Sequence, residues 1–213
     1  MPRPIPTTVC HFTHIEHLPT IAGHGLLSDT RAQAGGLLTT EAGEPRIKRR
    51  RARRAVRMSR GGVVADYVPF YYRSRSPMLS AIHNGRVPTF TGDTHDLIYL
   101  LSTVETLLDH GLPLVFTDRN ASLELAAYSD SLEELDDLVD WEVIRARYWA
   151  NTEDDPDRKE RRMAECLVHD HVPWEAFTGI AVYDAARERR VREILDRLDG
   201  NQPPIRVTPD AYF

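Results

Sequence analysis

The stretch Met163-Ala164-Glu165-Cys166-Leu167-Val168 holds a single carboxylate within an otherwise apolar run. Short apolar runs of this kind are typical of buried strands, so we predict a strand over residues 163–168. A buried carboxylate is costly unless it has a partner or a task, which makes Glu165 a candidate catalytic residue. A rigid strand can hold such a group beside a sugar whose glycosidic bond is breaking, since that transition state carries positive charge. The alternative is an edge-strand glutamate that faces water.

Other strand-like stretches lie on both sides of this segment. Residues 67–72 form an aromatic run, Tyr67-Val68-Pro69-Phe70-Tyr71-Tyr72. Its Pro69 lacks a backbone N–H and therefore indicates an edge strand or an irregular segment. Further strands are predicted over five short runs, at residues 9–13, 97–101, 113–116, 179–183 and 205–208.

Helices are predicted where a capping residue precedes an apolar stripe. Thr13 with Glu16 fits a capping box, and so does the sequence Ser102-Thr103-Val104-Glu105. Ser76-Pro77 is a favourable helix start. The arginine run after Pro45 has helical propensity, residues 122–149 are helical in pieces, residues 185–198 are amphipathic, and residues 28–45 and 151–157 are predicted to be loops. Strands and helices are mixed without a regular βαβ alternation, which predicts an α+β fold.

Length and composition favour one globular domain spanning residues 1–213. Hydrophobic residues make up 41% of the chain, and no apolar run approaches the roughly 20 residues of a membrane helix. The first six residues contain no stretch that could act as a signal peptide. Only Cys10 and Cys166 are present, so neither a disulfide framework nor a cysteine zinc site is expected. We therefore expect a cytoplasmic protein.

Charge is concentrated in one segment. The chain has a net charge of −5, yet residues 46–60 contain nine basic side chains and no acidic one. That segment carries +9, which leaves −14 on the remainder. A basic stretch on an acidic body is a candidate binding surface for phosphates. The alternative is a solvated basic loop.

The familiar nucleotide and metal motifs are missing from the sequence. It has no GxGxxG and no GxxxxGK[ST] motif, which excludes the two commonest phosphate-binding designs without excluding NAD. His11, His14 and His17 are spaced by three, but they straddle a strand and the following helix, so they do not aim at one point. His169 and His171 could share a face but lack a third ligand. No metal is expected.

Five blocks of this sequence, in order, resemble the DarT toxins of bacterial toxin–antitoxin systems. The resemblance covers nearly the whole chain. The blocks are His11-Phe12-Thr13-His14 with Gly25-Leu26-Leu27; Asp66-Tyr67-Val68-Pro69-Phe70-Tyr71 with Arg75-Ser76-Pro77; Thr117-Asp118-Arg119-Asn120-Ala121; Trp149 with Asn151-Thr152-Glu153-Asp154-Asp155-Pro156; and Arg162-Met163-Ala164-Glu165-Cys166-Leu167-Val168 with His171-Val172-Pro173.

The resemblance implies an ADP-ribosyltransferase fold with a split mixed sheet that holds NAD. The implied activity is transfer of ADP-ribose from NAD to a base of single-stranded DNA, thymine in the most similar branch, with release of nicotinamide. It also implies a DarG-type macrodomain antitoxin as partner. The NAD-binding loop region is expected at about residues 28–62 and the target-recognition loop at about residues 149–164.

Site residues follow from the same resemblance. Glu165 is similar to the family's catalytic glutamate, and Arg51 best fits its essential arginine, with the register open within residues 49–54. His11, Thr13, Arg51 and Tyr71 are expected to contact NAD, although Tyr71 and Tyr72 could instead stack on bases or pack in the core. Asn120 stands where several relatives carry a histidine, so a hydrogen-bonding role is expected there. The predicted DNA contacts are Arg50, Arg54, Asn120, Arg158 and Arg162, and Arg161 is a further candidate on the same loop.

Two other functions compete with this interpretation. An ADP-ribosyltransferase acting on protein or RNA would have the same fold and the same Glu165. A non-catalytic nucleic-acid-binding module built on the arginine run would bind in a salt-sensitive way without NAD. A panel of DNA, RNA and protein substrates distinguishes the first alternative from a DNA-modifying enzyme. A requirement for Glu165 and NAD would exclude the second alternative.

Overall fold

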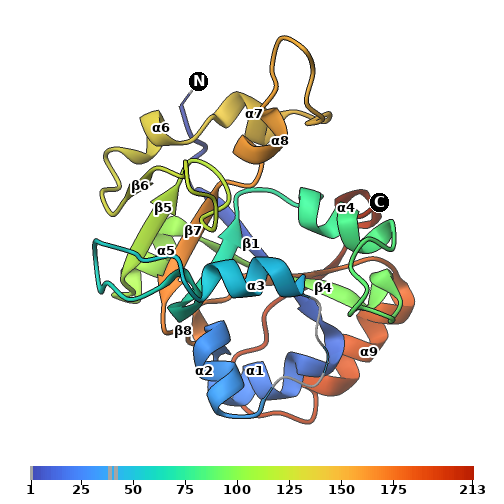
Figure 1. The fold of residues 1–213 in the computed structure, drawn as a ribbon. Helices are drawn as coiled ribbons and strands as arrows, with labels where there is room; N and C mark the ends of the chain where they lie inside the picture. The colour runs from blue at the N-terminus through green and yellow to red at the C-terminus, as the bar shows by residue number, and fades with distance from the viewer. Residues whose placement is uncertain (1, 38–39, 41–42) are drawn as a thin grey trace.

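In the computed structural model, which describes residues 2–37, 40 and 43–213, eight strands form one mixed sheet in the order β10-β9-β4-β1-β3-β7-β5-β6 (Figure 1). Neighbouring strands are antiparallel except for β9 and β10. These strands are β1 Thr8–His14, β3 Tyr67–Tyr71, β4 Leu97–Thr103, β5 Leu114–Thr117, β6 Tyr128–Ser129, β7 Glu165–His169, β9 Gly179–Val182 and β10 Ile205–Val207. The predicted α+β fold with a split mixed sheet is confirmed.

The sheet is split between β1 and β3. β1 pairs with β4 along its whole length, from Thr8↔Thr103 to His14↔Leu97, but it pairs with β3 only at Cys10↔Tyr71. On its other side β3 pairs fully with β7, from Tyr67↔His169 to Tyr71↔Glu165. The two half-sheets are therefore joined at one residue pair, and they diverge on either side of it.

Pro69 explains part of this split. It lies in the middle of β3 and has no N–H to offer β1, so a ladder cannot continue there. Its carbonyl instead accepts a hydrogen bond from His11 Nδ1 at 2.7 Å. Of the two predicted alternatives, the edge strand is wrong, because β3 lies inside the sheet, whereas the interrupted pairing with β1 agrees with an irregular segment.

Helices cover both faces of the sheet (Figure 1). One core packs α1, α5, α6, α7 and α9 against it through residues such as Leu18, Leu107, Leu135, Ile144 and Val191. A second core lies under α4, where Leu79 and Ile82 meet Tyr99 and Tyr212. The helices are α1 Leu18–His24, α2 Asp29–Ala34, α3 Pro45–Arg51, α4 Pro77–His83, α5 Val104–Asp109, α6 Leu135–Leu138, α7 Trp141–Arg145, α8 Arg158–Arg161 and α9 Ala185–Leu195.

Some predicted helix starts were correct and others were displaced. Ser76 caps α4 by accepting from the N–H of Leu79, as expected. The cap of α5 is Thr103 rather than Ser102. Thr13 caps no helix, because its hydroxyl bonds to His17 Nδ1 instead. Sequence reasoning also missed α2, which begins after Ser28 within a segment predicted to be a loop.

A small sheet supports the floor of the site. Strands β2 (Leu26–Leu27) and β8 (His171–Val172) form it. Gly25 precedes β2 with φ of 76°, and a Cβ atom there would lie 2.6 Å from the carbonyl oxygen of Val172. Only glycine fits this close approach. None of the helices in the described part of the chain is long and apolar enough to cross a membrane.

Candidate active site

Glu165 lies at the start of β7, where the split sheet opens, and its side chain is only 1% exposed. Its carboxylate accepts hydrogen bonds from Arg51 Nη1 at 2.9 and 3.1 Å and from the backbone N–H of Ala121 at 2.9 Å. A buried charge needs such partners to be tolerated. The alternative of a glutamate facing water is thereby excluded.

The loop after β5 holds this carboxylate in place. The Glu165 N–H donates to Thr117 Oγ1 at 3.1 Å, which aligns the end of β5 with the start of β7. The Tyr128 hydroxyl donates to the carbonyl of Ala121, and Arg54 Nη2 donates to the carbonyl of Glu124 at 2.9 Å. The loop that presents the Ala121 N–H to Glu165 is thus held at Ala121 and at Glu124.

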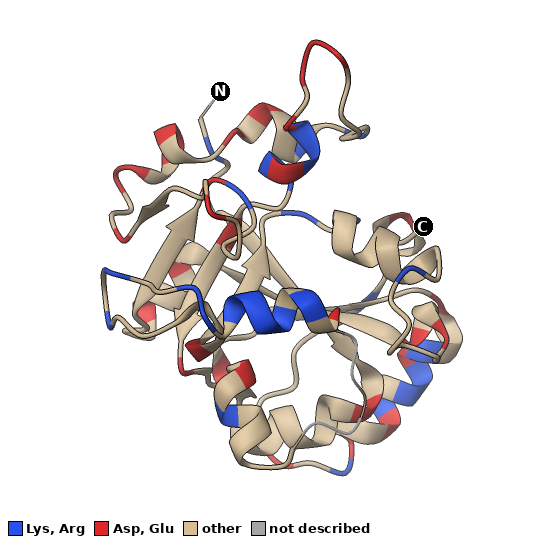
Figure 2. Ribbon diagram, in the orientation of Figure 1, with Lys and Arg blue, Asp and Glu red and all other residues tan. Residues whose placement is uncertain are grey.

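Arg51 reaches Glu165 from the last turn of α3. This helix begins at Pro45, with Glu44 as its cap, and it crosses in front of the sheet (Figures 1 and 2). Arg51 Nη2 is buried without a hydrogen-bond partner among the described residues. An unsatisfied buried guanidinium nitrogen is costly, so this donor is suited to a ligand in the cavity.

The remaining arginines of the run face elsewhere. Arg49, Arg50, Arg53 and Arg54 line a separate shallow groove on the outer side of α3, together with Ser122 and Glu124. Of the arginines in residues 49–54, Arg51 alone among the described residues both contacts Glu165 and lines the cavity. The helical register thus brings Arg51, rather than Arg49, Arg50, Arg53 or Arg54, to the Glu165 side of α3.

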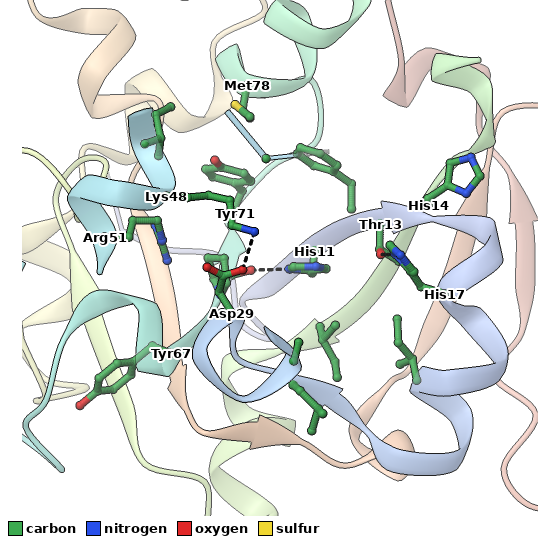
Figure 3. A pocket seen from close by; sticks show the side chains of 18 of the residues that line it. His11, Thr13, His14, His17, Asp29, Lys48, Arg51, Tyr67, Tyr71 and Met78 are labelled. Atoms are coloured by element: carbon green, nitrogen blue, oxygen red, sulfur yellow. Dashed lines mark hydrogen bonds and ion pairs between the residues drawn. The ribbon is translucent and has the colours of Figure 1, made fainter. Parts of the chain in front are cut away.

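A cavity of about 260 Å³ lies in front of Glu165, between the two half-sheets. Figure 3 shows side chains from β1, β3, α2 and α3 around it. Lys48 Nζ and Asp29 Oδ1 form an ion pair at 2.8 Å that joins α3 to α2 over this space. Residues that line the cavity include His11, Phe12, Thr13, Tyr71, Met78, Asn120, Met163 and Glu165.

Two side chains of β1 present defined hydrogen-bonding atoms. Because the carbonyl of Pro69 can only accept, His11 carries its proton on Nδ1, and Nε2 keeps its lone pair. Burial lowers the pKa of His11 to about 4, so the ring is neutral at physiological pH. His17 Nε2 accepts from the Thr40 N–H, so its Nδ1 donates to Thr13 Oγ1, and the Thr13 hydroxyl proton is directed elsewhere.

Tyr71 and Phe12 form an aromatic wall. Their rings stack with centroids 6.4 Å apart and an angle of 13°, and both line the cavity. Tyr72 points to the opposite side, where it is buried against Trp141 with ring centroids 5.1 Å apart. Tyr71 is therefore placed for ligand contact, whereas Tyr72 belongs to the core.

Asn120 lies at the cavity in the loop after β5 and is 5% exposed. Its Oδ1 accepts from the Ser122 N–H at 2.9 Å and from the Ser122 hydroxyl at 2.6 Å. A backbone N–H can only donate, so the atom facing it must be oxygen. The Asn120 amide nitrogen is left as a donor.

The predicted DNA-facing residues of the target-recognition loop need correction. Arg162 is 5% exposed, and its guanidinium donates to the carbonyls of Ser74, Val143, Ile144 and Ala146. A side chain enclosed in this way has no surface to offer DNA, so its predicted role was wrong. Arg158 is paired with Asp155 at 3.2 Å.

Sequence reasoning found the chemical groups but missed their supports. Lys48 and Asp29, the Ala121 N–H and the wall residues Phe12 and Met78 were not predicted. Ser28 as a helix cap was the signal that would have revealed α2 and hence Asp29.

No group of three or more His, Cys, Asp or Glu side chains arranged to hold a metal ion occurs in the part of the chain that the structure describes. Part of the expected NAD-binding region, residues 38–39 and 41–42, lies outside the described residues.

Comparison with known proteins places these features in one family. Residues 10–213 match the family described as ssDNA thymidine ADP-ribosyltransferase, DarT. A DNA ADP-ribosyl transferase of Thermus sp. (strain 2.9) is 38% identical over 212 residues, which are 99% of this chain and 98% of the relative. The solved structure of Thermus sp. 2.9 DarT in complex with ADP-ribosylated ssDNA is similar with a TM-score of 0.93 and 36% identity, covering 100% of this chain and 99% of that one. The same protein in complex with NAD+ matches with a TM-score of 0.89 and 35% identity, covering 99% of this chain and 100% of that one.

Proposed function

This chain belongs to the DarT family of single-stranded DNA thymidine ADP-ribosyltransferases, and we propose that its Glu165 and Arg51 carry the transfer of ADP-ribose from NAD to a thymine base. It is an NAD-dependent DNA ADP-ribosyltransferase with NAD as co-substrate. The single observation behind the residue assignment is the buried Glu165 carboxylate, held by Arg51 and the Ala121 N–H at the wall of the cavity.

The reaction needs a negative group beside the ribose. The bond between ribose and nicotinamide breaks, and its electron pair leaves with the nicotinamide, which becomes neutral and needs no proton. The new bond forms between the ribose carbon and the thymine ring nitrogen, whose proton passes to solvent water. Positive charge develops on the ribose meanwhile, and Glu165 stabilises it and accepts a hydrogen bond from a ribose hydroxyl.

Arg51 positions groups rather than moving protons. A guanidinium practically never loses its proton, so Arg51 is a poor general base. Its Nη1 orients Glu165, and its unpartnered Nη2 is available to a phosphate or to the target base. One residue thereby links the carboxylate to the bound substrates.

The other cavity groups fit a dinucleotide. His11 Nε2 accepts a hydrogen bond, the Thr13 hydroxyl donates one, and Tyr71 supplies an aromatic surface. Ribose hydroxyls and a planar ring need this combination of acceptor, donor and flat surface. The residues present therefore fit NAD.

We assign the base contact to Asn120 and phosphate contacts to the groove outside α3. The amide nitrogen of Asn120 can donate to a carbonyl oxygen of thymine, whereas cytosine carries an amino group in place of thymine O4. Arg50 is exposed in the groove, while Arg54 both lines the groove and holds the 118–127 loop. A target base must leave any duplex to reach the cavity, which suits single-stranded DNA.

The test is incubation with NAD and a randomised single-stranded oligonucleotide, followed by mass spectrometry of the modified position. We expect a product heavier by one ADP-ribose on thymine, and no product with Glu165→Ala. Oligonucleotides without thymine, RNA and a protein mixture complete the panel. Modification of RNA or protein in preference to DNA would contradict the assignment.

We also propose a DarG-type macrodomain antitoxin as partner and the cytoplasm as the site of action. Both rest on family membership, and the cytoplasm is where NAD and DNA occur together. The partner is checked by adding a macrodomain antitoxin to the modified oligonucleotide and measuring loss of the added mass. Persistence of the modification would argue against this partner.

A further inference from the structure

A second basic segment lies beside the cavity, outside α3. Residues 72–76 connect β3, whose Tyr71 lines the cavity, to α4, whose Met78 also lines it. Buried Arg162 donates to the carbonyl of Ser74 at 3.0 Å and to carbonyls at the end of α7. This guanidinium therefore holds residues 72–76 and the chain following α7 together, immediately before Met163 and Glu165.

Aromatic side chains gather where these two segments meet. The Trp149 ring packs edge-on against Phe213 with centroids 6.4 Å apart, and the Arg75 guanidinium lies 4.7 Å above the same Phe213 ring. Tyr148 is 78% exposed, with the Arg147 guanidinium 5.7 Å from its ring centroid. We call this surface, formed by Arg73, Arg75, Arg147, Tyr148, Trp149 and Phe213, the aromatic platform.

Among the described residues, the arginines of the platform have no acidic partner, unlike the neighbouring arginines of α8. In α8 and the loop before it, Arg161 is paired with Asp140, Asp155 and Asp157, and Arg158 with Asp155. In the part of the chain that the structure describes, no carboxylate lies within ion-pair distance of Arg73, Arg75 or Arg147. Figure 2 shows a basic stretch, in blue, on the connection into α4, above the basic helix α3 in this view.

Arg75 is held in a strained backbone conformation. Its φ of 55° lies in the left-handed region, which residues other than glycine rarely adopt. The Arg75 N–H donates to the Tyr99 hydroxyl at 3.1 Å, so the strained residue is tied to the core. Strain of this kind gathers at binding sites, where it fixes the direction of a side chain.

We propose that the aromatic platform binds the nucleotides next to the modified thymine. Arg73 and Arg147 contact phosphates, and a neighbouring base stacks on Trp149 or Tyr148. Exposed aromatic rings beside unpaired arginines are the combination that binds single strands without reading their sequence. This inference rests on the proposed function, and it places the strand across the cavity mouth between the platform and the α3 groove.

The experiment compares oligonucleotides of different length. One substrate is about three nucleotides long with a central thymine, and the others extend it to about twelve on the 5′ or the 3′ side. For the wild-type protein we expect extension on one side to lower KM. In Arg73→Glu/Arg147→Glu and in Trp149→Ala, the decrease in KM that extension brings should be about tenfold smaller, while kcat and NAD affinity stay unchanged.

A control and a second readout separate binding from folding. Arg189→Glu changes an exposed arginine on α9, in a different part of the fold, and should leave the length dependence intact. The double charge reversal should also reduce the slope of log affinity against log salt by about 0.7 for every phosphate that the variant no longer binds. If Trp149→Ala does not fold, Tyr148→Ala replaces it, because that side chain is largely exposed.

Two outcomes would overturn the proposal. One is that KM depends on oligonucleotide length in the folded variants as it does in the wild type. The other is that the variants raise KM equally for short and long oligonucleotides. Failure of the proposed function looks different, because the wild-type protein would then modify neither the short nor the long oligonucleotide.

Discussion

Glu165 shows how one side chain can be recognised, but not fully explained, from sequence. An isolated carboxylate in an apolar run predicted a buried functional group, and the structure confirms the burial. The sequence could not show that Arg51, 114 positions away, and the Ala121 N–H hold it, because these contacts depend on how the split sheet folds. The sequence favoured Arg51 but left the register open within residues 49–54, and the folded helix places Arg51 against Glu165.

Replacing Glu165 with glutamine tests its charge with little change in shape. We expect kcat to fall by about 10²-fold or more, because the amide no longer stabilises positive charge on the ribose. NAD affinity should fall much less, since most cavity contacts remain. Single-turnover kinetics and a separate NAD-binding titration measure the two effects. Comparable kcat values for the variant and the wild type would remove Glu165 from the chemistry.

His11 makes stability depend on pH. Burial lowers the pKa of His11 to about 4, below the ordinary value of 6.5, so the unfolded chain binds this proton more readily. The contribution of the neutral ring to the free energy of unfolding is therefore fully present above pH 6.5. It is lost as pH falls towards 4, and the loss is at most about 3 kcal/mol. Urea unfolding at about pH 7 and about pH 4.5 measures it. His11→Gln should flatten this dependence, and an unchanged slope in that variant would assign it to other groups.

At the scale of elements, sequence patterns located most strands and misplaced several connections. The strands around Leu97, Leu114 and Gly179 were predicted within a few residues, because their apolar runs are buried whatever surrounds them. Pro69 was interpreted as a sign of an edge strand or an irregular segment, and β3 lies inside the sheet, since only tertiary pairing decides strand order. The six-residue helix α2 has too few residues to show a periodic stripe.

Tyr128 tests the loop that holds Glu165. Tyr128→Phe removes the hydroxyl that donates to the Ala121 carbonyl, so the Ala121 N–H is held less firmly against Glu165. We expect kcat to fall by about tenfold with little change in the KM for NAD, because a loosened carboxylate is misplaced rather than removed. Tyr183→Phe, on the chain after β9, is the matched control. Equal kcat values in both variants would show that the hydrogen bond from Tyr128 to the Ala121 carbonyl does not contribute to catalysis.

Arg162 is expected to act in stability. Arg162→Ala leaves the carbonyls of Val143, Ile144 and Ala146 without their donor, which should lower the free energy of unfolding by about 3 kcal/mol or more. Arg158→Ala, which removes a partly exposed ion pair, should change it by less than about 1 kcal/mol. Chemical denaturation of both variants checks the contrast, and similar values for the two would refute it.

For the whole molecule, charge is distributed to suit a polyanion despite the net charge of −5. Arg49, Arg50 and Arg53 line the groove outside α3, whereas many acidic residues lie on α6, on α7 and in the loop after Trp149 (Figure 2). The sequence predicted the basic segment but not its orientation, because only the folded helix separates Arg51 from its neighbours.

Neutralising the groove should therefore weaken DNA binding selectively. For Arg49→Ala/Arg50→Ala/Arg53→Ala we expect affinity for single-stranded DNA to fall at low salt and the salt dependence to flatten, with NAD affinity unchanged. Fluorescence anisotropy over a salt series measures both quantities. The triple variant Arg189→Ala/Arg192→Ala/Arg197→Ala removes the same charge from the region of α9. An equal loss in the two triple variants would mean that only net charge matters.

The single junction between the half-sheets, Cys10↔Tyr71, has a thermodynamic consequence for the enzyme. A dinucleotide that contacts β1 on one side and β3 and β7 on the other adds cross-links to the few contacts, such as the hydrogen bond from His11 to the Pro69 carbonyl, that join the half-sheets already. By mass action, NAD at about 100 times its Kd would add about 2.7 kcal/mol to the resistance against unfolding. The enzyme consumes this same molecule, so each turnover depletes the compound that braces its own fold.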